Sequence, residues 1–134
     1  MKYRGFTLIE ILIVLVILSV LTVLAVSLYS STVRVGRRAD GVDTLLAISL
    51  AEERYRSVNT SYGTLAQVWS GVTTTTQGYY TLAISNVSAT GYTVTATAIG
   101  DQANDNESGT SCATLVLTVS SGTTTNTPVA CWPQ

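Results

Sequence analysis

The fold of this chain is decided by residues 11–33, which read ILIVLVILSVLTVLAVSLYSSTV and contain no charged residue. A helix of these 23 residues rises about 1.5 Å per residue and is therefore about 35 Å long. That length is enough to cross the hydrocarbon core of a bilayer, which is about 30 Å thick. The stretch therefore predicts a membrane-spanning helix near the N-terminus.

The rest of the chain has a different composition, which divides it into an anchor and a head. Only 11% of the 134 residues are charged, compared with about a quarter in ordinary soluble domains. Residues 57–134 are rich in Thr, Ser, Gly and Tyr and contain alternating apolar positions. A chain of this length has room for one compact core. We therefore expect a single folded head behind the apolar segment.

Residues 34–56 continue the helical pattern in an amphipathic form. Apolar residues recur there at helical spacing, with charged residues between them and no proline. We expect one nearly continuous helix over residues 6–56, of which about residues 6–33 cross the membrane and the second half packs against the head. The apolar residues of that second half are Val42, Leu45, Leu46 and Leu50.

Two glycines interrupt the arginine-rich part of this helix. Gly36 and Gly41 each weaken a helix by about 1 kcal/mol relative to alanine. They flank Arg37 and Arg38, and Arg34 lies just before them. We therefore expect the flexible point of the helix in this stretch.

In the second half of the chain the apolar period changes to two, which indicates half-buried strands. Asn86 and Gly91 mark a turn between the first two strands, so an antiparallel meander is expected. Residues 128–132 are too short to assign alone, and the threonine runs 73–76 and 123–125 are interpreted as exposed loops. The predicted fold class is α+β, a long N-terminal helix packed on a small antiparallel sheet of three to four strands. The alternating runs are residues 80–85, 92–98 and 114–120.

The chain contains no histidine, and this argues against most enzyme classes. Histidine is the commonest general base and is part of the usual Ser-His-Asp and Cys-His systems and of most zinc sites. Asp101, Asp105 and Glu107 are weak candidates for calcium binding, but their spacing fits no EF-hand. A solvated acidic loop is the preferred interpretation of these three residues. We expect no enzymatic activity, no cofactor and no metal.

Both cysteines of the chain, Cys112 and Cys131, lie in the head near the C-terminus. An even count fits a disulfide if the head lies outside the cytoplasm, and two buried free thiols are the alternative. Closing a loop of about 20 residues would stabilise the head by roughly 3 kcal/mol. The bond would also hold residues 128–132 beside the third strand.

The first residues look like a targeting leader rather than part of the fold. Residues 1–5, MKYRG, carry two positive charges and end in glycine immediately before the apolar run. Together with residues 5–10, GFTLIE, this leader resembles the processing site of type IV prepilins. In that family a membrane aspartyl peptidase cuts after the glycine and methylates the new N-terminal amine. The resemblance implies cleavage between Gly5 and Phe6 and an N-methylated Phe6.

Glu10 carries the only charge between the leader and Arg34. A carboxylate near the start of a membrane helix costs several kcal/mol unless it is neutralised or paired. The family resemblance implies that Glu10 pairs with the cationic amine of Phe6 on a neighbouring subunit. The alternative is a carboxylate that simply lies at the lipid headgroups.

An ordinary secretory signal is a second alternative, because residues 23–25, VLA, loosely fit the site of signal peptidase. The apolar stretch is longer than the usual apolar region of about 7–15 residues in such signals. The glycine of the leader would also have no role. Cleavage after Gly5 is therefore preferred, and it divides the chain into a leader (1–5), a long helix (6–56) and a head (57–134).

The resemblance extends into the head. The chain looks like Gram-negative pilins and minor pilins whose C-terminal loop is closed by a disulfide. It departs from them at Ser19 and Ser27, where many members have glycine and proline respectively. It implies a structural subunit of a type IV pilus, major or minor, that serves adhesion, twitching motility or DNA uptake. The residues that carry it are Tyr29, 51–55 (AEERY), 59–62 (NTSY), 112–115 (CATL) and 131–132 (CW).

The same resemblance implies a location and a set of partners. The precursor would be a single-pass protein of the inner membrane with its head in the periplasm, and the mature subunit would lie in an extracellular pilus on the cell surface. Its partners would be copies of itself and other pilins in a helical filament, the prepilin peptidase and the inner-membrane assembly platform.

Two other functions share the leader and the helix. A pseudopilin of a type II secretion system is one, although main pseudopilins tend to lack the disulfide loop and often bind calcium. A DNA receptor of natural transformation is the other. Phosphate contacts dominate nucleic-acid affinity, yet the chain has no lysine or arginine after Arg56. Direct nucleic-acid binding is therefore not expected, and Arg54 and Arg56 leave only weak contact open.

Overall fold

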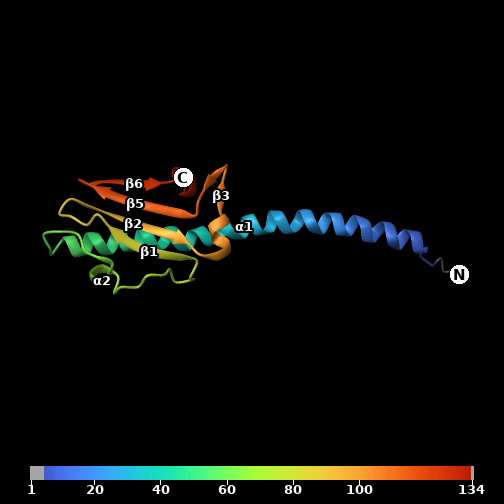
Figure 1. Cartoon of the computed structure of the whole chain (residues 1–134), viewed down its shortest axis with the longest axis horizontal. Helices are drawn as coiled ribbons and strands as arrows, with labels where there is room; N and C mark the ends of the chain where they lie inside the picture. The colour runs from blue at the N-terminus through green and yellow to red at the C-terminus, as the bar shows by residue number, and fades with distance from the viewer. Residues whose placement is uncertain (1–4, 134) are drawn as a thin grey trace. The chain divides into compact units, whose positions relative to one another are not determined.

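The computed structural model describes residues 5–133, except for the side chains of residues 27 and 28. The described residues form two α-helices, six strands and two 3-10 helices (Figure 1). The predicted α+β class is confirmed. Helix α1 spans Leu8–Arg56 and belongs to two compact units, one up to Val33 and one from Arg34 onward. Each unit is described by itself.

The first unit contains the apolar part of α1. The hydroxyl of Thr7 accepts a hydrogen bond from the backbone N–H of Glu10 at 3.3 Å, as an N-cap residue does. Every side chain from Gly5 to Val26 is exposed. The most apolar window of α1 has a mean hydropathy of 3.2, and none of it is buried. By length and composition this helix can cross a membrane.

The second unit contains a four-stranded antiparallel sheet with the strand order β1-β2-β5-β6 (Figure 1). A separate short hairpin pairs β3 with β4. The strands are β1 (Tyr80–Ser85), β2 (Gly91–Ala98), β3 (Asn106–Glu107), β4 (Thr110–Ser111), β5 (Thr114–Ser120) and β6 (Thr123–Thr127). The remaining elements are α2 (Leu65–Val68) and the 3-10 helices η1 (Gly100–Asn104) and η2 (Val129–Cys131). Strands β1, β2 and β5 coincide with the three runs predicted from the sequence.

The fourth strand differs from the prediction. It is β6, which contains the threonine run 123–125 that was interpreted as a loop, whereas residues 128–132 include the 3-10 helix η2. Ser121 and Gly122 have φ angles of 50° and 81°, which allows a tight two-residue turn that pairs Ser120 with Thr123. Threonine is a strong strand former. Because it is polar, the run shows no alternation of apolar and polar residues, and it was therefore interpreted as a loop.

The other threonine run, residues 73–76, is only partly exposed. Thr75 is 4% exposed. Its backbone N–H donates to the carbonyl of Tyr80, and its hydroxyl accepts from the backbone N–H of Tyr80 at 3.2 Å. The prediction of an exposed loop is therefore wrong for Thr75. The run lies along the edge of β1, where Thr74 forms a bridge with Thr81.

The core of the head forms between one face of α1 and the sheet. Val42, Leu45 and Ile48 supply the helix face, and the hydroxyl of Tyr92 donates to Ser49 at 2.9 Å. The prediction of a one-sided helix holds for Val42 and Leu45. Leu46 and Leu50, which were expected on the same face, are instead 49% and 54% exposed. The sheet contributes Tyr80, Leu82, Tyr92, Val94, Ala96, Leu115, Leu117 and Val119 to this core.

The two glycines of α1 have different roles, and α1 is continuous through both. A Cβ added at Gly41 would lie 3.0 Å from the ring of Tyr80 and 3.1 Å from Leu115, whereas one added at Gly36 would meet nothing within 4 Å. Gly41 therefore allows the helix to approach the sheet closely. Glycine lowers the stability of a helix relative to alanine. At Gly41 the close packing against Tyr80 and Leu115 offsets this loss, whereas Gly36 makes no such contact.

We expect Gly41→Leu to lower the free energy of unfolding by about 1–3 kcal/mol, because the added side chain overpacks the contact with Tyr80. The matched change Gly36→Ala in the same helix should raise it by up to about 1 kcal/mol. Thermal unfolding of the full-length protein in detergent, followed by near-ultraviolet circular dichroism, measures both. Equal unfolding temperatures for Gly41→Leu and the wild type would contradict the close packing.

Candidate functional site

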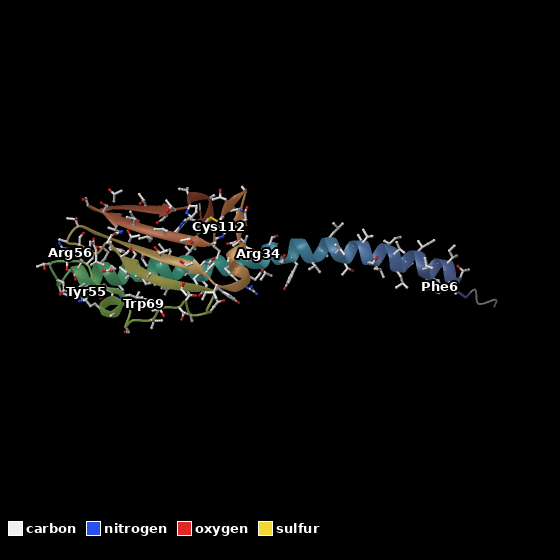
Figure 2. The ribbon with its side chains drawn as sticks, in the orientation of Figure 1. Phe6, Arg34, Tyr55, Arg56, Trp69 and Cys112 are labelled. Carbon is white, nitrogen blue, oxygen red and sulfur yellow. A yellow bond between two sulfur atoms is a disulfide. The ribbon has the colours of Figure 1, made fainter. Side chains whose placement is uncertain are left out.

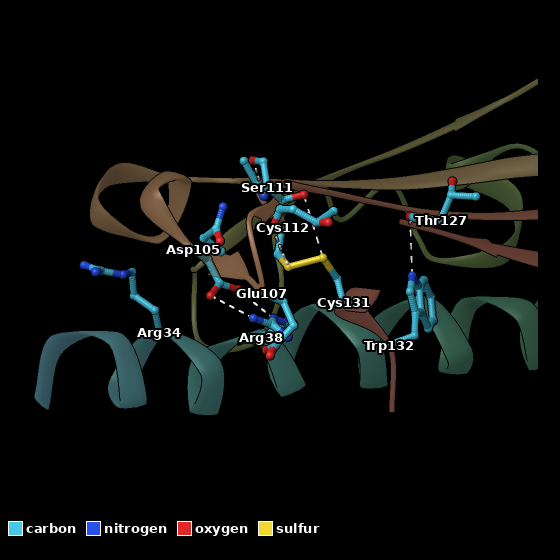
Figure 3. The surroundings of a disulfide bond; sticks show 12 residues. Arg34, Arg38, Asp105, Glu107, Ser111, Cys112, Thr127, Cys131 and Trp132 are labelled. Atoms are coloured by element: carbon cyan, nitrogen blue, oxygen red, sulfur yellow. Dashed lines mark hydrogen bonds and ion pairs between the residues drawn. A yellow bond between two sulfur atoms is a disulfide. The ribbon is translucent and has the colours of Figure 1, made fainter. Parts of the chain in front are cut away.

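Arginines of α1 and acidic residues that follow the sheet strand β2 form an ion-pair cluster. The guanidinium of Arg38 makes two hydrogen bonds to the carboxylate of Asp105, at 2.7 Å and 3.0 Å, and a third to Glu107 at 3.1 Å (Figure 3). The side chains of Arg38 and Asp105 are only 8% and 1% exposed. Such two-pronged contacts are among the strongest hydrogen bonds in proteins.

Asp101 forms a second, more exposed part of the cluster. Its carboxylate lies 3.2 Å from Arg34 and 4.0 Å from Arg37, and its side chain is 58% exposed. The guanidinium of Arg37 also lies 4.8 Å from the ring centroid of Tyr79. The hydrogen bond from Arg34 lowers the pKa of Asp101 below its ordinary value. Hydrogen bonding to Asp105 raises the pKa of Arg38, and burial opposes this effect.

These contacts correct the interpretation of Asp101, Asp105 and Glu107 as a solvated acidic loop. Only Asp101 fits that description, since Asp105 is buried and Glu107 is partly covered by its bond to Arg38. The arginine partners lie 67 and 69 residues away in sequence, so local spacing gave no sign of them. Within residues 5–133 no group of three or more side chains is arranged to hold a metal ion.

Gln102 connects the cluster to the sheet. The two N–H groups of its amide are shared among three acceptors: the carbonyl of Arg34 at 2.9 Å, the hydroxyl of Tyr80 at 2.9 Å and the carboxylate of Asp105 at 3.2 Å. Gln102 is 1% exposed, and its Oε1 has no hydrogen-bond partner among the described residues. The hydrogen bonds of its buried amide nitrogen hold the surrounding groups in one arrangement. The 3-10 helix η1 is therefore fixed between α1 and β1.

The disulfide lies next to the ion pairs. Cys112 and Cys131 are bonded with a Cα–Cα distance of 5.6 Å, so the expected pairing is present and the alternative of two free thiols is not. The backbone N–H of Cys112 donates to the carbonyl of Asp105 at 2.9 Å. The indole N–H of Trp132 donates to the carbonyl of Thr127 (Figure 3). The C-terminal loop is thereby joined to the buried Arg38–Asp105 pair.

A second buried acid, Glu52, fixes the loop after α1. It is fully buried, and one oxygen accepts a hydrogen bond from the backbone N–H of Gly63 at 2.7 Å. Burial raises the pKa of Glu52. The neighbouring Glu53 accepts from the hydroxyl of Tyr62 at 3.1 Å. Sequence reasoning missed Glu52, although it follows Leu45 and Ile48 at helical spacing on the core face.

The residues predicted for processing and assembly all lie on the surface of the first unit. Gly5 and Glu10 are exposed. Phe6 is 80% exposed, and Figure 2 labels it near the start of α1. Glu10 forms no ion pair with any of residues 5–133. Lys2 and Arg4 lie outside the described residues. Cleavage after Gly5 and pairing between Glu10 and Phe6 remain predictions.

The two remaining arginines lie near the end of α1. Arg56, labelled in Figure 2, donates to the carbonyls of two loop residues. These are the carbonyls of Asn59 at 2.7 Å and Ala89 at 3.1 Å. Arg54 is exposed and has no ion pair within the described part of the chain. These are the cations of the head that no carboxylate neutralises.

We expect Arg38→Ala to lower the free energy of unfolding by about 3–5 kcal/mol, because it leaves the carboxylate of Asp105 buried without a counter-charge. Arg37→Ala is the matched control. It removes an arginine from the same turn but only an exposed ion pair and a ring contact, and should cost about 1 kcal/mol. Urea unfolding of the full-length protein in detergent gives both values. Equal losses of unfolding free energy in the two variants would show that the buried Arg38–Asp105 pair stabilises the head no more than an exposed ion pair does.

Comparison with protein families gives two matches. The family described as "Type IV minor pilin ComP, DNA uptake sequence receptor" matches residues 27–116, which is about two thirds of the chain. The family described as "Prokaryotic N-terminal methylation motif" matches residues 1–26. Comparison with curated proteins gives no match. The predicted membership of the pilin family is confirmed. The matches also fit a membrane-anchored precursor and a structural role alongside other pilins. This chain belongs to the family of type IV minor pilins.

Proposed function

We propose that this minor pilin enters the pilus after cleavage between Gly5 and Phe6, with Glu10 paired to the methylated amine of Phe6 on a neighbouring subunit. One observation carries the proposal. The side chains from Gly5 to Val26 are all exposed, and Glu10 is the single charge among them. An exposed apolar helix with one acid needs both an apolar environment and a counter-charge.

Assembly supplies both requirements. Apolar helices leave lipid contacts and pack against one another along the filament, and close packing and paired polar groups stabilise such bundles. The N-methylated amine keeps a positive charge, so it can neutralise Glu10 of the next subunit. The partners would be the prepilin peptidase and the inner-membrane assembly platform, and the subunit itself would catalyse no reaction.

The disulfide supports a head that folds outside the cytoplasm. Cys112 and Cys131 are bonded to each other, and such bonds persist in oxidising compartments such as the periplasm. The head would therefore lie in the periplasm in the precursor and on the cell surface in the pilus. The family match favours this role over that of a type II secretion pseudopilin, because it is to a minor pilin of the type IV pilus.

We expect Glu10→Val to abolish incorporation into filaments while the head stays folded, because the change removes the counter-charge of the neighbour's amine. Thr22→Val is the matched control. The hydroxyl of Thr22 bonds to the carbonyl of Leu18 in its own helix, so its loss should leave incorporation intact. Immunoblots of sheared filaments from a complemented deletion strain measure incorporation. Glu10→Val subunits at the control's level would contradict the pairing.

DNA binding is a second candidate function, and the description of the matching family favours it. Arg34, Arg37 and Arg38 all lie within 4.0 Å of a carboxylate oxygen. We infer that direct contact with DNA phosphates would use Arg54 and Arg56. Two cations release few counterions, so the affinity would be modest and its dependence on salt shallow.

We expect the protein to bind duplex DNA weakly at low salt, with a slope of log K against log salt of about −2 or shallower, since each phosphate contact contributes about −0.9. Changing Arg54 and Arg56 together to Gln should remove this binding. Arg37→Gln, the control, should keep it. Fluorescence anisotropy with a labelled duplex across a salt series tests this. Binding that survives the double change would place the DNA site elsewhere.

A further inference from the structure

Helix α1 presents a second face in the head, beside the face that it buries in the core. Val35, Leu46 and Leu50 are 45%, 49% and 54% exposed, and Ala39 is also exposed. At about 100° per residue these four positions lie within about 60° of one another around the helix. The exposed Asp43 and Arg54 extend the stripe to about 100°, the width typical of a helix face that packs against a partner. In a folded head this stripe is apolar surface without a covering element.

A cleft lies along the first part of this stripe. Val35, Ala39 and Asp43 line it from α1, and Trp132 and Pro133 line it from the C-terminal segment, with Glu107 close by. Its volume is about 400 Å³. Figure 3 shows this region, where Trp132 follows the disulfide above α1. The walls of the cleft are largely apolar, and Arg38 and Glu107, which also line it, are already paired with each other. Asp43 is therefore the unpaired charge of the cleft, which suits apolar side chains followed by a cation.

The stripe carries one acid and one base without partners. Asp43 and Arg54 are both exposed, and neither side chain has an ion pair or a hydrogen bond to any of residues 5–133. The exposed carboxylate of Asp101, by contrast, is paired within the chain with Arg34 and Arg37. Asp43 and Arg54 are eleven residues apart, close to three helical turns, so they lie on the same face.

The same spacing of eleven residues relates the other members of the stripe. It places Leu46 eleven residues after Val35 and Leu50 eleven residues after Ala39, just as Arg54 follows Asp43. The apolar residues of the cleft therefore have a matching set further along the helix. A parallel copy shifted by about 16 Å along α1 would set the second group against the first.

We propose that this cleft binds Leu46 and Leu50 of a second, parallel copy of the chain, with Asp43 paired to Arg54 of that copy. The inference rests on the proposed function, because a shared membrane anchor inserts every copy in the same direction and so makes neighbours parallel. The two contact surfaces differ, so the contact is of the head-to-tail kind that extends along a filament rather than closing a dimer.

Crosslinking between copies tests this register without changing the stripe's own contacts. Gly36 and Ala47 are also eleven residues apart, both are exposed, and a Cβ added at Gly36 would meet nothing within 4 Å. Full-length Gly36→Cys and Ala47→Cys chains with different tags would be produced together in a bacterial host that makes no other pilin. A short bis-maleimide would then be added to the membranes.

The mixed product between the two variants should exceed either homotypic product several-fold. Thr97→Cys, an exposed position on β2, is the control and should give no mixed product with Ala47→Cys. Asp43→Arg on the Gly36→Cys chain should remove the mixed product, and Arg54→Asp on the Ala47→Cys chain should then restore it.

Three results would overturn the docking: no mixed product, mixed and homotypic products in equal amounts, or no effect of the charge reversal. Each of them leaves the filament experiment with Glu10→Val unaffected, since no filament is needed here. A chain that does not fractionate with the membranes would instead overturn the anchor, and with it the parallel arrangement on which the docking depends.

Discussion

The buried ion pair between Arg38 and Asp105 is the interaction on which the arrangement of the head depends. Two charges taken out of water are stable only while both remain and their hydrogen bonds are satisfied. The carboxylate of Asp105 also accepts from Gln102, and its backbone carbonyl accepts from Cys112. A single buried contact therefore connects the long helix, the 3-10 helix η1 and the disulfide-closed C-terminal loop.

The chemistry of this chain lies in its surfaces rather than in a reactive centre. Along the head, α1 buries one face against the sheet and exposes another that carries Leu46, Leu50 and two unpaired charges. From Leu8 to Val26 the helix exposes apolar side chains all round, with Glu10 as the only charge among these residues. A subunit that must leave a membrane and join a filament needs surfaces of this kind, because the proposed assembly would use apolar contact and charges paired between copies.

The elements with strong periodicity could be predicted from the sequence. The long helix and strands β1, β2 and β5 follow from helical spacing and strict alternation, and the fold class follows from them. Strand β6 could not be predicted in the same way, because its exposed threonines show no alternation of apolar and polar residues. The buried position of Asp105 was also missed, since its partner Arg38 lies 67 residues earlier. Gly41 was read as a weak point of the helix, while its close contact with Tyr80 is visible only in the folded head.

The central claim is that the apolar helix survives maturation and begins at Phe6. Intact-mass and N-terminal fragment spectra of subunits from sheared surface filaments test it most directly. We expect one species that starts at Phe6, carries a single added methyl group on its amine and lacks two hydrogens because Cys112 and Cys131 are bonded. A subunit that keeps Met1, or one that has lost the apolar segment by cleavage near Ala25, would contradict it.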